Sequence, residues 1–209
     1  RQFYNENKLV CIQNAVDVEA INYMSNEPFK IPCKYILFCG RFDETSKNIS
    51  LLIKAYNKSK IYNVGVKLLL LGEGEDKAIY EELITNLSIT KHVEFKPFTD
   101  NPYVYIKHAT CTVLTSFYEG FPLVLIESLA CGTPVIAINC ETGPSEIIVN
   151  NVNGLLLETY NEDELSLALQ KVTNEKATLN KFKANTVKSI QKFNLESISK
   201  KWQSVLENH

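Results

Sequence analysis

The chain has 209 residues, 45% of them hydrophobic, and 22 Lys and Arg against 24 Asp and Glu give a formal net charge of −2. This length fits one domain with appended helices and can bury a sizeable core, and the nearly neutral charge excludes a general attraction to nucleic acid. The six cysteines form no Cys-x-x-Cys pair and the three histidines cannot build a His-rich site, so we expect reduced thiols, no metal and a cytoplasmic location. The sequence contains no signal peptide and no apolar run long enough to cross a bilayer.

Residues 1–33 carry the weakest pattern. A short apolar run at 9–12 precedes Asn14-Ala-Val-Asp17, and Pro28 and Pro32 interrupt residues 18–33. Because proline and the residue before it disfavour helix, we expect a linker with one helical turn.

Residues 34–39 form an almost continuous apolar run, which predicts a buried parallel strand. Gly40 and Arg41 follow, then a polar loop to Lys47 and a helix whose apolar residues recur at helical spacing, namely Ile49, Leu52, Ile53 and Tyr56. The planar fork of arginine and the point charge of lysine suit a diphosphate. A solvated loop without a ligand is the alternative.

Residues 66–71 form a second apolar strand, closed by Gly72-Glu-Gly74. Lys77 stands where a dinucleotide fingerprint needs its third glycine, so that fingerprint fails. We predict instead a tight turn into a helix, whose buried face carries Ile79, Leu83 and Leu87.

A short strand is predicted at 92–98, and its exit carries Lys96 and Phe98. The Phe98 ring either stacks on a ligand or belongs to the core. Residues 101–109 then form a short predicted helix, in which His108 fits a capping or surface position better than a catalytic one.

The stretch from Ser116 to Gly132 carries the strongest functional pattern. It comes after an apolar, β-branched run at 111–115, breaks at Gly120 and restarts as a helix with Pro122 in its first turn. Unpaired N–H groups and the positive end of the helix dipole gather at such a helix start. The sequence therefore predicts an anion site here, for phosphate above all.

Two carboxylates flank this turn. Glu119 lies in the loop and Glu127 lies in the helix, roughly 7 Å along the axis from Pro122 at 1.5 Å per residue. Glu127 at the mouth of a pocket suits the vicinal hydroxyls of a ribose, and Glu119 suits a second hydroxylated group. Two ordinary solvated glutamates are the alternative.

Further strands are predicted at 134–138 and 154–157, with Pro144 opening a helix between them. Strands and helices thus alternate to about residue 160, which predicts an α/β fold with a doubly wound parallel sheet.

Residues 161–209 are helical in pattern. One apolar stripe contains Leu165, Ala168, Leu169 and Val172, and another contains Ile198, Trp202, Val205 and Leu206. Between residues 175 and 201, seven lysines stand against two glutamates. This excess fits a solvated helix face, with peripheral contact to an anionic membrane as the alternative.

The segment Glu119-Gly-Phe-Pro-Leu-Val-Leu-Ile-Glu127, continuing through 128–136, resembles the Glu-x7-Glu signature of retaining GT-B glycosyltransferases of family 4. Residues 143–148 and 153–156 are similar to the segments that come next in that family, and Asn14–Asp17 resembles its interdomain joint. The resemblance implies the Rossmann-like, C-terminal half of a GT-B fold with extra C-terminal helices. Its parts would be a remnant of the interdomain linker at 1–33, a nucleotide-sugar-binding domain at 34–160 and C-terminal helices at 161–209.

The resemblance also implies retaining transfer of a hexose or N-acetylhexosamine from a nucleoside-diphosphate sugar. Glu127 would hold the ribose and Glu119 the donor sugar, while Arg41 and Lys47 would stabilise the leaving diphosphate. The catalytic set would be Glu119, Arg41 and Lys47. The donor-binding set would be Gly40, Lys96, Phe98, Gly120, Phe121, Pro122, Leu123 and Glu127. The sequence has no Asp-x-Asp motif, so we expect neither a metal nor another cofactor.

The acceptor expected from the resemblance is a glycan or a lipid-linked sugar, held by an N-terminal domain that this chain lacks. We therefore expect the chain alone to bind a nucleoside diphosphate weakly and to transfer little or no sugar. Its expected location is cytoplasmic, with peripheral contact to the inner face of the cell membrane as an option.

Three other classes of protein stay open from the residues alone. A glycoside hydrolase would need two carboxyls facing each other across about 5 to 10 Å, which Glu119 and Glu127 fit poorly. A sugar-nucleotide epimerase would act without an acceptor. A non-catalytic nucleotide-binding or regulatory module would bind nucleotide and turn nothing over.

Overall fold

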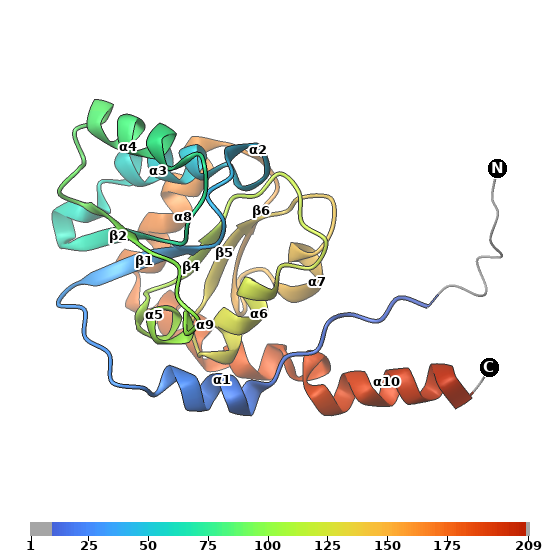
Figure 1. Cartoon of the computed structure of the whole chain (residues 1–209). Helices are drawn as coiled ribbons and strands as arrows, with labels where there is room; N and C mark the ends of the chain where they lie inside the picture. The colour runs from blue at the N-terminus through green and yellow to red at the C-terminus, as the bar shows by residue number, and fades with distance from the viewer. Residues whose placement is uncertain (1–9, 208–209) are drawn as a thin grey trace, which may run out of the picture.

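The computed structural model describes residues 10–207, which contain one six-stranded parallel sheet between two layers of helices (Figure 1). The strands run in the order β3-β2-β1-β4-β5-β6. Their bounds are Lys34–Cys39 (β1), Val66–Leu71 (β2), Val93–Lys96 (β3), Thr112–Leu114 (β4), Val135–Ile138 (β5) and Gly154–Leu157 (β6). All six predicted strands are present, and the doubly wound α/β prediction is confirmed.

Helices cover both faces of the sheet. One face is covered by α3 (Ile49–Ser59), α4 (Lys77–Asn86) and α8 (Glu162–Asn174). The other is covered by α1 (Val18–Ser25), α5 (Tyr103–His108), α6 (Leu123–Ala130) and α7 (Pro144–Ile147). The short α2 (Glu44–Lys47) and the 3-10 turn η2 (Ile61–Val64) flank α3.

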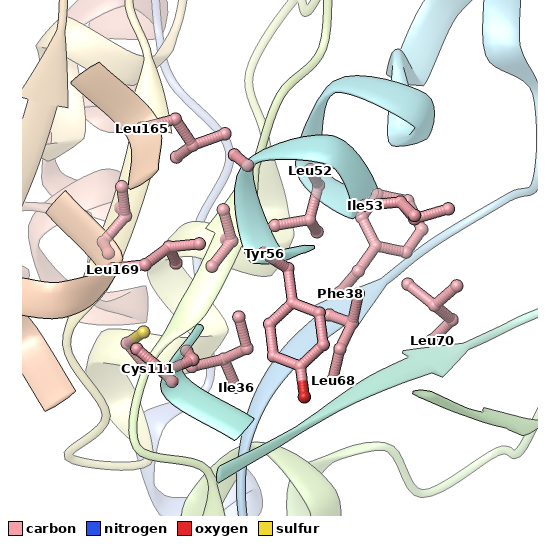
Figure 2. Packing of buried hydrophobic residues seen from close by; sticks show 14 of the residues in the cluster. Ile36, Phe38, Leu52, Ile53, Tyr56, Leu68, Leu70, Cys111, Leu165 and Leu169 are labelled. Atoms are coloured by element: carbon pink, nitrogen blue, oxygen red, sulfur yellow. The ribbon is translucent and has the colours of Figure 1, made fainter. Parts of the chain in front are cut away.

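The first layer shows why the strands read as continuous apolar runs. Alternate strand residues such as Ile36 and Phe38 point toward α3, whose Leu52, Ile53 and Tyr56 lie over them (Figure 2). All five are fully buried, and the opposite face of the same strands is packed against the second layer. A strand covered on both sides has no polar face.

The C-terminal helices cross from one layer to the other. Along α9 (Lys176–Ser189), Phe182 belongs to the first core, while Ile190 just beyond its end belongs to the second. The 3-10 turn η3 (Gln191–Phe193) and α10 (Leu195–Glu207) follow. The predicted α8 stripe is buried, whereas Trp202 of α10 is 53% exposed. No helix within residues 10–207 is long and apolar enough to cross a membrane.

Three local predictions were wrong in detail. The expected single turn after residue 17 is the eight-residue α1, because Asp17 caps it by accepting from the Ala20 N–H at 2.9 Å. In α4 the buried residues are Tyr80 and Ile84, and Ile79 is 48% exposed, because the helix packs on Phe42 through the Tyr80 ring. Leu83 and Leu87 are partly buried against the same core.

Pro122 is the residue before α6 and not a member of its first turn. Its ψ of 92° is extended rather than helical, so the helix proper begins at Leu123. Residues 1–9, including Leu9 of the short apolar run, lie outside the described residues.

Candidate functional site

The candidate site lies at the carboxyl ends of β1 and β4, the two neighbouring strands at the centre of the sheet. The chain leaves β1 toward α3 on one face, and it reaches β4 from α5 on the other. This reversal is the topological switch point, where open parallel sheets leave a crevice for ligands. The two predicted ligand-binding segments, residues 40–47 and 119–127, therefore meet at the same edge of the sheet.

Close backbone contact shapes the exits of β1 and β2. The Gly40 N–H donates to the Leu71 carbonyl at 3.0 Å. Gly72 has a φ of +143°, and a Cβ there would lie 2.0 Å from the Gly40 carbonyl oxygen. Gly74 lies equally close to the Phe42 backbone. The glycines at 72 and 74 thus let two loops pass each other, which is the role of a tight turn rather than of a dinucleotide fingerprint.

Helix α2 places the side chain of Lys47 at the crevice. Asp43 caps this helix, accepting from the Ser46 N–H at 3.2 Å and from the Thr45 hydroxyl at 2.8 Å. These hydrogen bonds, with help from the nearby charge of Arg41, lower the pKa of Asp43. The Thr115 hydroxyl after β4 donates to the Lys47 carbonyl at 3.0 Å. This hydrogen bond therefore connects the segment after β1 with the segment after β4.

An ion pair joins the two predicted ligand-binding segments. Lys47 Nζ lies 2.7 Å from Glu119 Oε1, with 23% and 12% of the two side chains exposed. The Ser116 hydroxyl donates to the same oxygen at 2.7 Å. Within residues 10–207, Glu119 Oε2 has no hydrogen-bond partner, so one carboxylate oxygen is anchored and the other can accept a ligand hydroxyl.

The start of α6 closes the crevice on the side of β4. Pro122, the residue before α6, makes no side-chain cap. The first backbone N–H groups of this short helix therefore donate no hydrogen bond to a capping side chain. A Cβ at Gly143 would lie 2.5 Å from Pro122 Cδ, and the Thr142 hydroxyl donates to the Glu119 carbonyl. The loop after β5 thus packs against the turn of residues 119–122 and donates a hydrogen bond to it.

Two adjoining cavities share the exit of β1. The first, of about 490 Å³, is lined on one side by Arg41 and Lys47 and on the other by Glu119 and residues 121–124. The second, of about 330 Å³, is lined by residues 71–73, Phe98, Thr99 and Pro102. Cys39, Gly40 and Arg41 border both cavities. Arg41 is exposed, so its guanidinium can serve a ligand that spans the two.

Glu127 lies below this junction rather than in either cavity wall. Its Oε1 accepts from the Tyr103 hydroxyl at 3.4 Å. Burial raises the pKa of Glu127, and the hydrogen bond from Tyr103 opposes the rise. Burial and then the charge of Glu127 raise the pKa of the neighbouring Cys39 thiol to about 12. Glu127 is thus a half-buried acid near Cys39.

The two predicted residues after β3 separate in the structure. Phe98 is 66% exposed and lines the smaller cavity, which rules out the core alternative for its ring. Lys96 lines neither cavity, and its ammonium pairs with Glu94 at 3.1 Å on the same strand. Gly120 lies in the loop that carries Glu119 and borders neither of these two cavities.

Sequence reasoning missed four polar or aromatic neighbours of the site, namely Ser46, Glu73, Tyr103 and Ser116. Glu73 Oε1 accepts from the Phe98 N–H at 3.3 Å and so positions that loop. The spacing of Ser116 three residues before Glu119 was available as a local signal. Nothing local links Tyr103 with Glu127, since only packing of α5 against α6 brings them together.

The strand order and the switch-point crevice define a Rossmann-like α/β domain of the nucleotide-binding type. The family model of the glycosyl transferases group 1 matches residues 23–189, which is most of the chain. The chain belongs to that family.

Curated relatives agree with this assignment. The chain is 36% identical over 163 residues to the N-acetylgalactosamine-N,N'-diacetylbacillosaminyl-diphospho-undecaprenol 4-alpha-N-acetylgalactosaminyltransferase of Campylobacter jejuni, a match that covers 78% of this chain and 44% of that protein. It is 28% identical over 237 residues to an uncharacterised glycosyltransferase of Methanocaldococcus jannaschii, covering 97% of this chain and 58% of that protein. The chain thus spans about half the length of these relatives.

Solved structures confirm the fold. A mutant of Staphylococcus aureus TarM, crystallised with fondaparinux, alpha-GlcNAc-glycerol and UDP, superposes with a TM-score of 0.84 at 29% identity, covering 98% of this chain and 40% of that one. The lipopolysaccharide outer core galactosyltransferase WaaB superposes with a TM-score of 0.82 over 99% of this chain and 57% of that one, and at 20% identity it shows the fold alone. The expected Rossmann-like half of a GT-B fold is therefore confirmed.

Proposed function

We propose that this chain is the donor-binding domain of a retaining glycosyltransferase that uses a nucleoside-diphosphate sugar. The carrying observation is that Arg41, Lys47, Glu119 and the start of α6 border one cavity at the switch point. Cations and free N–H groups suit a diphosphate, and a carboxylate with one open oxygen suits sugar hydroxyls.

The two cavities divide the donor between them. The diphosphate and sugar occupy the larger cavity, and the nucleoside extends past Arg41 into the smaller one, where the exposed Phe98 ring offers a stacking surface. In this proposal Glu127, which lies near Cys39 at the junction of the two cavities, binds the ribose diol. The Tyr103 hydroxyl already donates to one oxygen of Glu127.

Catalysis in this proposal is stabilisation of the leaving group. As the bond from the sugar to the diphosphate breaks, negative charge grows on the diphosphate, and fixed donors around it lower the barrier. Both Arg41 and Lys47 border the cavity. Lys47 is paired with Glu119, whereas the Arg41 guanidinium makes no hydrogen bond or ion pair within residues 10–207. We assign no metal to this step, and unchanged turnover by the full-length enzyme in EDTA is the test of that part.

The relatives support the choice of donor. TarM was crystallised with UDP, so UDP is the first nucleotide to try. The names of curated relatives specify alpha-glucosyl transfer in Bacillus subtilis and alpha-N-acetylglucosaminyl transfer in Staphylococcus aureus. We propose a hexose or N-acetylhexosamine donor, a glycan or lipid-linked acceptor bound by the rest of the protein, and action at the cytoplasmic face of the membrane.

Calorimetric titration of the chain with UDP, GDP and ADP tests the donor site. We expect one nucleotide to bind, and Arg41→Ala to weaken it about ten- to a hundredfold, since a charge-assisted hydrogen bond contributes about 1.5–3 kcal/mol. Glu127→Ala should weaken the nucleoside diphosphate but not inorganic pyrophosphate.

Lys54→Ala is the matched control, because Lys54 is exposed on α3 away from both cavities. Equal binding by the wild type and by Arg41→Ala would remove the proposed diphosphate site. Binding without turnover after the chain is joined to the acceptor half of its own protein would favour the non-catalytic module.

A further inference from the structure

A third and larger cavity lies at the opposite, amino-terminal edge of the sheet. It measures about 990 Å³ and is bordered by the segment before β1, the end of α5 and the first turns of α9. The helices α5 and α9 lie near each other below the sheet in Figure 1. It shares no lining residue with the two cavities of the donor site. An inference about it therefore stands apart from the proposed function.

The ionisable groups of this cavity are cationic or neutral. Lys34, Lys176 and Lys183 line it together with His108 and Cys33, and no aspartate or glutamate of the described residues does. None of the three lysine ammonium groups pairs with a carboxylate within residues 10–207. The acid beside Lys176 in the sequence is Glu175, whose Oε2 is occupied by the Thr178 hydroxyl at 2.7 Å.

The charge of Lys183 also acts on the buried Cys111 just before β4. Burial raises the pKa of the Cys111 thiol to about 12, and the charge of Lys183 opposes that rise. Lys176 and Lys183 are seven residues apart on α9 and share one face of that helix.

The rest of the wall is mostly apolar. Ile31, Pro32, Val66 and Leu179 line the cavity, and Val64, which is 63% exposed, stands at its edge. Neutral polar groups at residues 174 and 180 lie among the lysines. A lining that combines three unpaired cations with apolar side chains matches a ligand that has an anionic head and an apolar body.

We propose that this cavity binds the phosphate group of an amphiphilic phosphate ester, with Lys34, Lys176 and Lys183 on the phosphate and the apolar wall on the carbon chain. Lysine is a point-charge donor that accepts phosphate without demanding one geometry. The ligand class covers both a membrane lipid headgroup and a free phosphate ester, and the chemistry common to them is the phosphate.

Three soluble probes separate these sources. Dihexanoyl phosphatidic acid carries head and tails, dihexanoyl phosphatidylcholine carries the same tails without the exposed monoester, and glycerol 3-phosphate carries the head alone. Titration of the 209-residue chain below the micelle concentrations, followed by heteronuclear NMR, should give the tightest binding for phosphatidic acid. We expect the shifts to centre on the start of α9 and on Lys34.

The test variant is Lys34→Gln/Lys176→Gln/Lys183→Gln, and the control is Lys54→Gln/Lys181→Gln/Lys188→Gln. Both remove three positive charges, and Lys181 and Lys188 lie on α9 but outside the cavity. The test variant should weaken phosphatidic acid at least about tenfold, because its direct phosphate contacts are lost. The control should shift the affinity by less than about twofold, through screened long-range charge alone.

Equal loss in the two variants would overturn the proposal, since it would show attraction to net charge only. Equal affinity for phosphatidic acid and phosphatidylcholine would overturn it as well. Glycerol 3-phosphate binding as tightly as phosphatidic acid would overturn the lipid part and assign the cavity to free phosphate esters. Thermal melts that match the wild type show that the six exposed lysines are not needed for folding.

Discussion

Replacing Glu119 by glutamine separates its contribution to the fold from the contribution to donor binding that we propose. The carboxylate holds Lys47 at 2.7 Å, and both side chains are more than three-quarters covered. This pair lies between an exposed ion pair, which contributes less than about 1 kcal/mol, and a buried one, whose disruption costs about 3–5 kcal/mol. We therefore expect a coupling energy of about 2 kcal/mol between Lys47 and Glu119 in a double-mutant cycle.

The cycle uses Lys47→Met, Glu119→Gln and the double variant, each unfolded in urea. Nucleotide binding should respond in the opposite sense for the two single variants. Lys47→Met should weaken UDP about tenfold, because a cation near the diphosphate is lost. Glu119→Gln should tighten UDP about threefold, because Lys47 is released and a negative charge near the diphosphate disappears.

UDP carries no sugar, so this comparison is blind to any contact of Glu119 with the donor sugar. In the full-length enzyme, Glu119→Gln should instead weaken binding of the intact sugar nucleotide, because the variant loses an acceptor for a sugar hydroxyl. Weaker UDP binding by Glu119→Gln would refute the reasoning, since it would mean that the carboxylate supports the diphosphate site instead of competing for Lys47. A coupling energy below about 0.5 kcal/mol would show that solvent screens the pair.

Three further outcomes are expected. Glu127 has a pKa raised above its ordinary value of 4.5 by burial, so the native state holds its proton more tightly and the stability of the wild type falls as pH rises from about 4.5 through the native pKa. Glu127→Gln should lack this fall and melt higher than the wild type at pH 8, and an unchanged pH slope in calorimetry would contradict the burial. Gly74→Ala should cost about 1–3 kcal/mol of unfolding free energy, because its Cβ would lie 2.1 Å from the Phe42 carbonyl oxygen; Gly120→Ala, where a Cβ meets open space, is the control and should be near neutral. Leu169→Ala, at a fully buried position, should cost about 2–5 kcal/mol in urea unfolding, and a smaller loss would show that α8 collapses onto the cavity.

Much of the proposed donor site can be predicted from the local sequence. The apolar run of β1, followed by Gly40 and Arg41, already predicts a strand exit with a cation. The break at Gly120 predicts the start of α6. These predictions depend on neighbours within a few residues, where turn chemistry and periodicity act. Glu127 was placed at a pocket mouth by counting along its helix, and its burial below Cys39 could not be counted in this way.

The sequence by itself determined the alternation of strands and helices and the order of the loops that carry Arg41, Lys47 and Glu119, because side-chain periodicity is written residue by residue. Only the tertiary structure decided which of those loops touch. The pairing of Lys47 with Glu119 joins residues 72 apart. Lys96, a predicted ligand group, pairs with Glu94, and Tyr80 rather than Ile79 faces the core. Each depends on how one element is rotated against another, and that rotation is fixed by packing across the sheet rather than by local pattern.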